Sequence, residues 1–204
     1  MSLMVQPQIP FLFVGNHPCL DFINTEVVLS GQPTDLLPSW KDLVAWLIEA
    51  GLVTGKEAKE SERVWDRHGP ETLKQAKAFR STMRHMAERV ADGKPVPQAA
   101  LDTINHLLRH RVGYSQISRQ HGRFERKYES KSEDTVQLLG LLAEAASDLL
   151  VRCDLSLVKK CQNPTCVLFF YDTTKNHARH WCSMSLCGNR SKVAAHYHRH
   201  RRKT

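Results

Sequence analysis

Apolar positions in residues 1–158 recur mainly at intervals of three and four, the spacing of one face of an α-helix. The clearest example begins after Ser39, and its apolar stripe consists of Trp40, Leu43, Val44, Leu47 and Ile48. Ser39 and Asp42 have the spacing of a capping box, and Gly51 follows the last apolar position. The pattern therefore predicts a helix that begins after Ser39 and ends before Gly51.

Further helices are predicted along the same part of the chain. Residues 54–67 form a weaker, more polar candidate, and Pro70 suits the first turn of a long helix that ends before Gly93. Pro97 opens another in the same manner. Residues 136–150 are apolar nearly all round, as expected of a helix enclosed by others. We expect a mainly α-helical body with this last helix at its centre.

Two short stretches have the character of strands. Residues 114–118 and 123–128 flank a Gln-His-Gly turn and predict a small β-hairpin, and Phe11 to Val14 predict a short strand. Asp21 and Asn24 follow that strand, one helical turn apart among apolar neighbours. These two side chains form either a small polar ligand pocket or a pair of caps, and capping is the favoured interpretation.

Charge divides the chain into two domains, residues 1–158 and 159–204. The first carries 19 Lys and Arg against 20 Asp and Glu, whereas the second carries 10 against the single acid Asp172. This asymmetry predicts that the C-terminal domain contacts a polyanion. The body contains no phosphate-binding loop, dinucleotide fingerprint, esterase or zincin motif, which favours a binding protein over an enzyme.

No segment has the character of a membrane span or a secretory signal. The longest apolar run near the start, residues 9–14, is far too short to cross a bilayer and has no basic region before it. We therefore expect a cytoplasmic protein.

Four of the six cysteines lie in the basic domain, as two pairs of identical spacing separated by 15 residues. They are Cys161, Cys166, Cys182 and Cys187. In a reducing cytoplasm two such pairs predict one structural Zn²⁺ held by four thiolates, rather than disulfides. His177 and His180 remain alternative ligands, and Lys159, Lys160 and Arg190 are placed to offset the negative charge of the site.

The order of elements around these cysteines predicts a treble-clef-like zinc finger. Residues 167–171 form a strand, residues 178–181 return beside it, and a helix runs from Gly188 to about Arg201. On that helix one face is expected to pack toward the zinc site, through Val193, Tyr197 and His200. The opposite stripe is basic and suits a phosphate backbone, and it consists of Lys192, His196, Arg199 and Lys203.

Two motifs resemble known families. The cysteine pairs, the strand Leu168-Phe169-Phe170-Tyr171-Asp172 and the run Cys182-Ser-Met-Ser-Leu-Cys187-Gly188-Asn189-Arg190 resemble the CGNR zinc finger. Residues 15–25 are similar to the opening of the ABATE-type region that accompanies this finger in bacterial proteins. The resemblance implies a stress-related transcription regulator with the finger as its DNA-binding part, and it implies that the four cysteines are the zinc ligands.

From this resemblance and the charge pattern we expect a DNA-binding regulator whose body senses a ligand or forms a homodimer. Phosphate contacts are expected from Lys192, Arg199, Arg201, Arg202 and Lys203. Candidates for reading base edges are Asn189, Arg190 and His196, although Asn189 and Arg190 could instead brace the zinc loop.

Three alternatives remain open. An RNA-binding domain would stack unpaired bases on Phe169, Phe170, Tyr171 and Trp181. A metal-dependent nuclease would use Asp172, His177 and His180 around an open metal position, and a zinc module that binds only proteins would have no affinity for nucleic acid.

Overall fold

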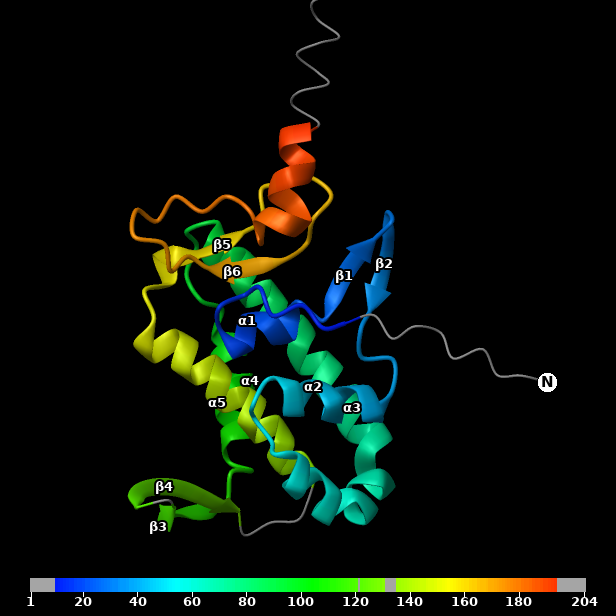
Figure 1. Ribbon diagram of the computed structural model, residues 1–204, viewed down its shortest axis with the longest axis vertical. Coiled ribbons are helices and arrows are strands. Elements are labelled where there is room, and N and C mark those ends of the chain that lie inside the picture. Colours follow the sequence, from blue (N-terminus) through cyan, green and yellow to red (C-terminus); the bar gives the residue numbers. More distant parts are fainter. Residues whose placement is uncertain (1–9, 121, 131–134, 194–204) are drawn as a thin grey trace, which may run out of the picture.

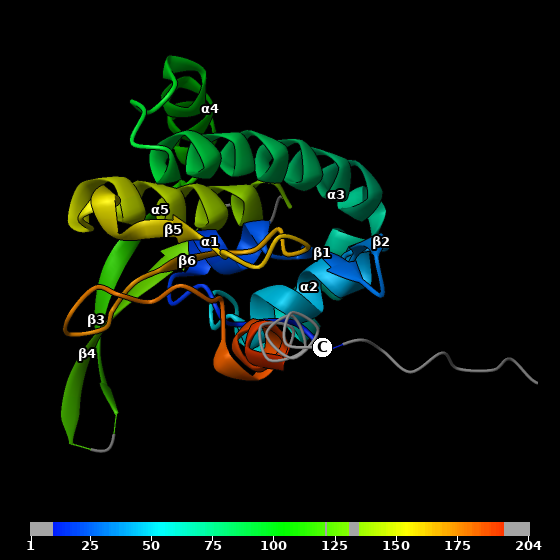
Figure 2. The same ribbon diagram turned by 90° about the horizontal axis from the view of Figure 1, so that it is seen from above.

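The computed structural model describes residues 10–120, 122–130 and 135–193. Its body consists of five helices, which are α1 (Pro18–Ile23), α2 (Trp40–Glu49), α3 (Gly55–Ala91), α4 (Gln98–Leu108) and α5 (Val136–Arg152). Helix α5 packs against α1, α3 and α4, so the prediction of a central helix is confirmed (Figures 1 and 2). Leucine and alanine side chains are buried on several sides of α5, because other helices surround it.

Helix α2 forms as its sequence predicts. Asp42 closes a capping box on Ser39, with 2.9 Å between the Ser39 backbone nitrogen and the Asp42 carboxylate. Gly51 has a φ of 71°, the left-handed conformation that commonly follows a helix end. The predicted stripe is buried at Trp40, Leu43 and Leu47, and Ile48 lies at its exposed margin.

The two helices predicted on either side of Pro70 are one continuous helix, α3, and the prediction of a helix start at Pro70 is wrong. Thr54 and Glu57 form the capping box that begins the helix, and Pro70 lies inside it. A proline inside a helix removes one backbone hydrogen bond and bends the helix without always ending it, and Figure 2 shows the curvature of α3. Next to the proline, α3 packs closely on α2: a Cβ added at Gly69 would lie 2.3 Å from Cγ of Trp40.

Three antiparallel hairpins complete the fold. The predicted one is formed by β3 (Gly113–Gln120) and β4 (Arg123–Ser130). A second hairpin, formed by β1 (Glu26–Leu29) and β2 (Gln32–Asp35), was not predicted; its turn has Ser30 and Gly31 at positive φ, and its second strand contains Pro33. Residues 11–14, predicted as a strand, belong to no strand.

The third hairpin corrects the predicted layout of the zinc finger. Strand β6 (Phe169–Tyr171) pairs with β5 (Val158–Lys160), which precedes the first cysteine, and not with residues 178–181. The finger therefore consists of a hairpin whose connection carries Cys161 and Cys166, a long loop, a π-helical turn at Met184–Gly188, and an α-helix that continues over residues 189–193.

The body and the finger share their apolar cores. Phe169 and Val158 of the finger hairpin belong to the large core of the helical body. A second core surrounds the cysteines and includes two residues from the body, Val27 of β1 and Leu36, which follows β2. Since 46 residues with few large apolar side chains bury little surface by themselves, the body completes the finger as well as carrying it.

Among the described residues, no helix combines the length and the apolar character that crossing a membrane requires.

Candidate metal centre

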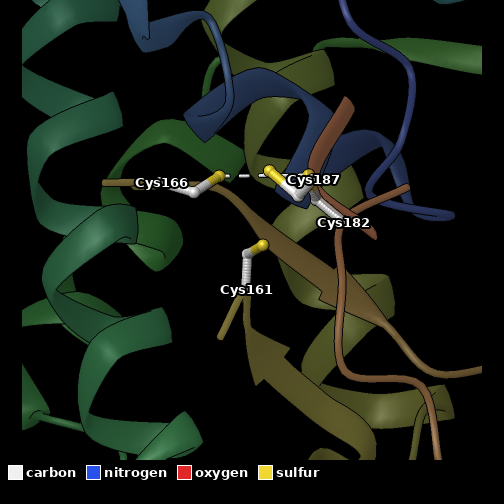
Figure 3. A group of neighbouring side chains, drawn as sticks. All are labelled: Cys161, Cys166, Cys182 and Cys187. Carbon is white, nitrogen blue, oxygen red and sulfur yellow. Dashed lines mark hydrogen bonds between the residues drawn. The ribbon is translucent and has the colours of Figure 1, made fainter. Parts of the chain in front are cut away.

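The four cysteines predicted as ligands converge on one point. Their sulfur atoms all lie within 4.8 Å of one another. Figure 3 shows the four side chains pointing toward a common centre. The Sγ atoms of Cys166 and Cys182 are 3.9 Å apart. A tetrahedron with Zn–S bonds of about 2.3 Å has edges of about 3.8 Å, so the donor set suits one Zn²⁺ ion.

Hydrogen bonds between residues that are close in the sequence position each pair of cysteines. In the first, the backbone nitrogen of Cys161 donates to Leu168 and that of Cys166 donates to Asn163, each over 2.9 Å. In the second, the Ser183 hydroxyl accepts from the Leu186 nitrogen over 3.0 Å and caps the π-helical turn that carries Cys187. Each pair of cysteines is thus held on a local turn, and this is why their spacing could be recognised in the sequence.

The electrostatics of the sulfurs call for a cation. Hydrogen bonds from Cys166 and Cys182 lower the pKa of the Cys161 thiol, whereas the nearby Cys161 raises the pKa of Cys166 and Cys182. The Cys161 thiol therefore ionises more readily than those of Cys166 and Cys182. A bound Zn²⁺ removes this mutual penalty, since its charge stabilises all four thiolates.

Two arginines brace the centre, and sequence reasoning missed one of them. The Arg190 guanidinium lies 3.5 Å from the Cys187 sulfur, and its Nε donates to the carbonyl of Leu186. Arg179 donates to the carbonyls of Cys182 and Trp181 and, over 2.8 Å, to that of Val14 in the body. Its guanidinium also lies 4.2 Å from the centre of the Phe170 ring. No motif marks Arg179, because its link to the body joins it to Val14, 165 residues away in the sequence.

Asp172, the only acidic residue of the finger sequence, does not reach the surface. Asp172 is fully buried, and its carboxylate accepts from Lys159 over 2.7 Å, from Thr174 and from the Arg179 backbone nitrogen. Burial alone would raise the pKa of Asp172, but these hydrogen bonds outweigh it and hold the pKa well below its usual range. Lys159 is therefore paired with Asp172 rather than with the thiolates, and Lys160 extends toward the Phe169 ring instead.

The histidines proposed as alternative ligands do not join the cluster. His177 and His180 are exposed, and the Nδ1 atom of His177 lies 3.3 Å from the backbone oxygen of Asp172. In the part of the chain that the structure describes, the metal-binding group contains only the four cysteines.

Asp21 and Asn24 are both buried and hydrogen-bonded to backbone groups, but their side chains bond Gly15 and Phe169 and do not cap a helix as expected. Asp21 accepts a hydrogen bond from the Gly15 nitrogen over 2.7 Å. Asn24 is 1% exposed, and its amide pairs with both backbone groups of Phe169, donating over 2.8 Å and accepting over 2.9 Å. Asn24 thereby joins the body to the strand that follows the first cysteine pair.

The residues predicted to bind nucleic acid fall into two groups. Asn189, Arg190 and Lys192 are exposed on the helix that follows the last cysteine. His196, Arg199, Arg201, Arg202 and Lys203 lie outside the described residues, as do Tyr197 and His200. Val193 is 54% exposed, so the prediction that it packs toward the zinc site is wrong. Among the described residues, the small core around the cysteines includes Val27 and Leu36 from the body.

The aromatic residues proposed for RNA stacking are mostly enclosed. Phe169 and Phe170 are fully buried, Tyr171 and Trp181 are half-buried, and the Tyr171 hydroxyl contacts the backbone nitrogen of Asp154. Successive strand residues face opposite sides, so Phe169 enters the body core and Phe170 the zinc-site core. No continuous stacking platform remains on the described surface of this strand.

Comparisons with known proteins match both parts of the chain. The model of the ABATE family, described as a putative stress-induced transcription regulator, matches residues 16–152. The model of the CGNR zinc finger matches residues 158–200. No curated protein matches the sequence significantly.

Proposed function

Because the chain belongs to the ABATE family of putative stress-induced transcription regulators and ends in a CGNR zinc finger, we propose that it is a bacterial, cytoplasmic regulator that binds duplex DNA. Zinc is architectural in this proposal, and the basic C-terminal finger is the part that contacts DNA.

The burial of Asp172 is the observation that carries the proposal. The finger has 10 Lys and Arg and one acid, and that acid is enclosed and already paired with Lys159. Its described surface therefore presents cations such as Lys160, Lys175 and Lys192 without an acidic neighbour from the finger itself. Such a surface favours a polyanion, and phosphate contacts supply most of the affinity of proteins for DNA.

Roles are proposed for individual residues as follows. Arg190 braces the zinc loop through Cys187, which leaves Asn189 and His196 as the candidates for reading base edges. Phosphates are contacted by Lys192, Arg199, Arg201, Arg202 and Lys203.

A binding role also agrees better than catalysis with the chemistry of the site. Four sulfurs fill a tetrahedral zinc shell and leave no open position for substrate. The carboxylate that a nuclease would need, Asp172, is engaged by Lys159, Thr174 and Arg179.

The proposal is tested by fluorescence anisotropy of random duplex DNA with the zinc-loaded protein at moderate salt. The Lys192→Ala/Arg199→Ala variant should bind at least ten-fold more weakly, because two phosphate contacts are lost. A matched control, Lys74→Ala/Arg152→Ala, removes one exposed lysine and one exposed arginine from the body and should bind like the wild type.

Equal losses in both variants would show that net charge, and not the finger, drives binding. Preference for single-stranded RNA over the duplex in direct competition would favour an RNA-binding role, and no binding to either would favour a protein partner. Each of these outcomes overturns the proposal.

A further inference from the structure

Among the described residues, the β3–β4 hairpin is an arm that projects from the helical body. Beyond their pairing with each other, neither strand makes extensive contact with another described element. Figure 1 shows the arm at the end of the long axis opposite the zinc finger, and Figure 2 shows it extending away from the helices. An isolated two-stranded hairpin is at best marginally stable in water, so two strands of eight residues need a further contact.

The two edges of the arm differ in charge. Strand β4 carries five charged residues out of eight, which are Arg123, Glu125, Arg126, Lys127 and Glu129. Strand β3 carries one, Arg119, near the turn. Charged side chains are a common way to keep an edge strand from pairing with another chain, so β4 is protected and β3 is open to strand addition.

The hydrogen-bonding pattern shows which groups of β3 are available. Only two residues separate Gln120 from Arg123, and Gly122 has a φ of 79°, as in a tight hairpin turn. The residues next to such a turn form a hydrogen-bonded pair, and pairs alternate along the strands. Ser115, Ile117 and Arg119 therefore direct their backbone N–H and C=O groups away from β4.

One face of the arm exposes two large apolar side chains beside Arg119 and Arg126. Ile117 is 70% exposed and Phe124 is 69% exposed. Arg119 pairs across the strands with Phe124, and its guanidinium lies 4.7 Å from the centre of that ring. Ile117, Arg119 and Phe124 thus lie on the same face of the hairpin. If another pair of strands is added beside β3, these side chains gain neighbours on the enlarged face.

We propose that β3 pairs with β3 of a second copy of this chain in antiparallel orientation, which joins two arms into a four-stranded sheet. A two-fold axis at Ile117 places the two Ile117 side chains opposite each other. It also places each Arg119 opposite Ser115 of the second copy, at opposite ends of the paired strands.

The charge pattern of β3 favours this occupant and this orientation. Parallel pairing in register would set the two Arg119 guanidinium groups side by side, whereas antiparallel pairing separates them. The two-fold relation also satisfies the same outward-facing groups on both copies, as an isologous interface requires. The zinc fingers remain free at the far ends of the two protomers (Figure 1).

Sedimentation equilibrium of the full-length, zinc-loaded protein tests the inference. The wild type should sediment as a dimer, and Ile117→Lys should raise the dimer dissociation constant at least ten-fold, because it sets two like charges on the axis of an edge pair. The matched control is Phe124→Lys, which introduces the same charge at an equally exposed position on the protected strand and should leave the dissociation constant within about two-fold. Circular dichroism and zinc content verify that both variants are folded.

A second variant tests the edge rather than the side chain. Ile117→Pro removes an outward-facing N–H without removing a hydrogen bond between β3 and β4, and it should also give a monomer. A monomeric wild type would overturn the inference. So would equal weakening by Ile117→Lys and Phe124→Lys, which would assign the association to the exposed apolar side chains, or a dimer that persists in Ile117→Pro.

Discussion

Single buried side chains join the body to the finger, and Asn24 is the clearest example. Its amide satisfies both backbone groups of Phe169, and all of these atoms are buried. The four cysteines could be predicted from the sequence because each pair lies within six residues. The partner of Asn24 is 145 residues away, and no local pattern indicates it.

Asn24→Ala should destabilise the zinc-loaded protein by about 3 kcal/mol, because a buried donor and a buried acceptor each lose their partner. Urea unfolding followed by circular dichroism measures this change. Asn105→Ala, at an exposed position of α4, is the control and should change the free energy of unfolding by less than about 0.5 kcal/mol. A similar small loss in Asn24→Ala would mean that the link to Phe169 is not made.

Asp21 gives the fold a pH dependence of its own. Burial raises the pKa of its carboxyl group to about 6, against the hydrogen bond from Gly15, which lowers it. Between about pH 4 and pH 6 the folded protein therefore holds a proton that the unfolded chain has released, and stability falls as pH rises through this window.

The stability difference between the wild type and Asp21→Asn should accordingly change by up to about 3 kcal/mol from pH 4 to pH 7, in favour of the variant at high pH. Asparagine keeps the acceptor for the Gly15 nitrogen but does not titrate. Urea midpoints of both proteins across this range provide the measurement. Parallel curves would show that Asp21 titrates normally in the folded protein.

At the scale of elements, periodicity predicted helices well where packing agreed with it. Helices α2, α4 and α5 follow their apolar stripes, and the exposed β3–β4 hairpin follows its turn. The pattern divides helix α3 at Pro70, because proline suits the first turn of a helix, whereas the structure accommodates Pro70 inside it. The β1–β2 hairpin was missed, because its strands have four residues each and one contains a proline.

Gly69→Ala tests the packing of α3 directly. An alanine in a helix is normally more favourable than glycine, but here its Cβ would overlap the buried Trp40 ring, and we expect a loss of about 1–3 kcal/mol. Gly55→Ala, in the first turn of the same helix and with open space around it, is the control and should be neutral or slightly stabilising. Thermal or urea unfolding distinguishes the two, and a stabilised Gly69→Ala variant would refute the close contact.

At the scale of the molecule, the two parts separated by charge prove to be bound together. Asn24, Arg84 and Arg179 each form hydrogen bonds between body and finger, and both cores contain residues from each part. The sequence predicted the two parts from their charge and cysteines. The contacts between them depend on side chains that meet only in the folded chain.

Removal of zinc should therefore destabilise the helical body as well as the finger. A chelator such as EDTA should lower the midpoint of the helical circular dichroism transition by several degrees, because the strand that carries Phe169 loses its anchor. Cys161→Ser should reproduce this shift and be insensitive to the chelator. An unchanged helical transition, with zinc loss verified by metal analysis, would show that the two parts are independent.

The salt dependence of duplex binding by the zinc-loaded protein tests the central claim, that the finger is a zinc-stabilised reader of DNA, most directly. About six phosphate contacts predict a slope of about −5 in a plot of log affinity against log salt. In Lys192→Ala/Arg199→Ala the slope should be about −3, because two phosphate contacts are lost. Chelation of zinc should abolish the wild-type affinity at moderate salt. An affinity that hardly changes with salt, or that survives the loss of zinc, would contradict the account.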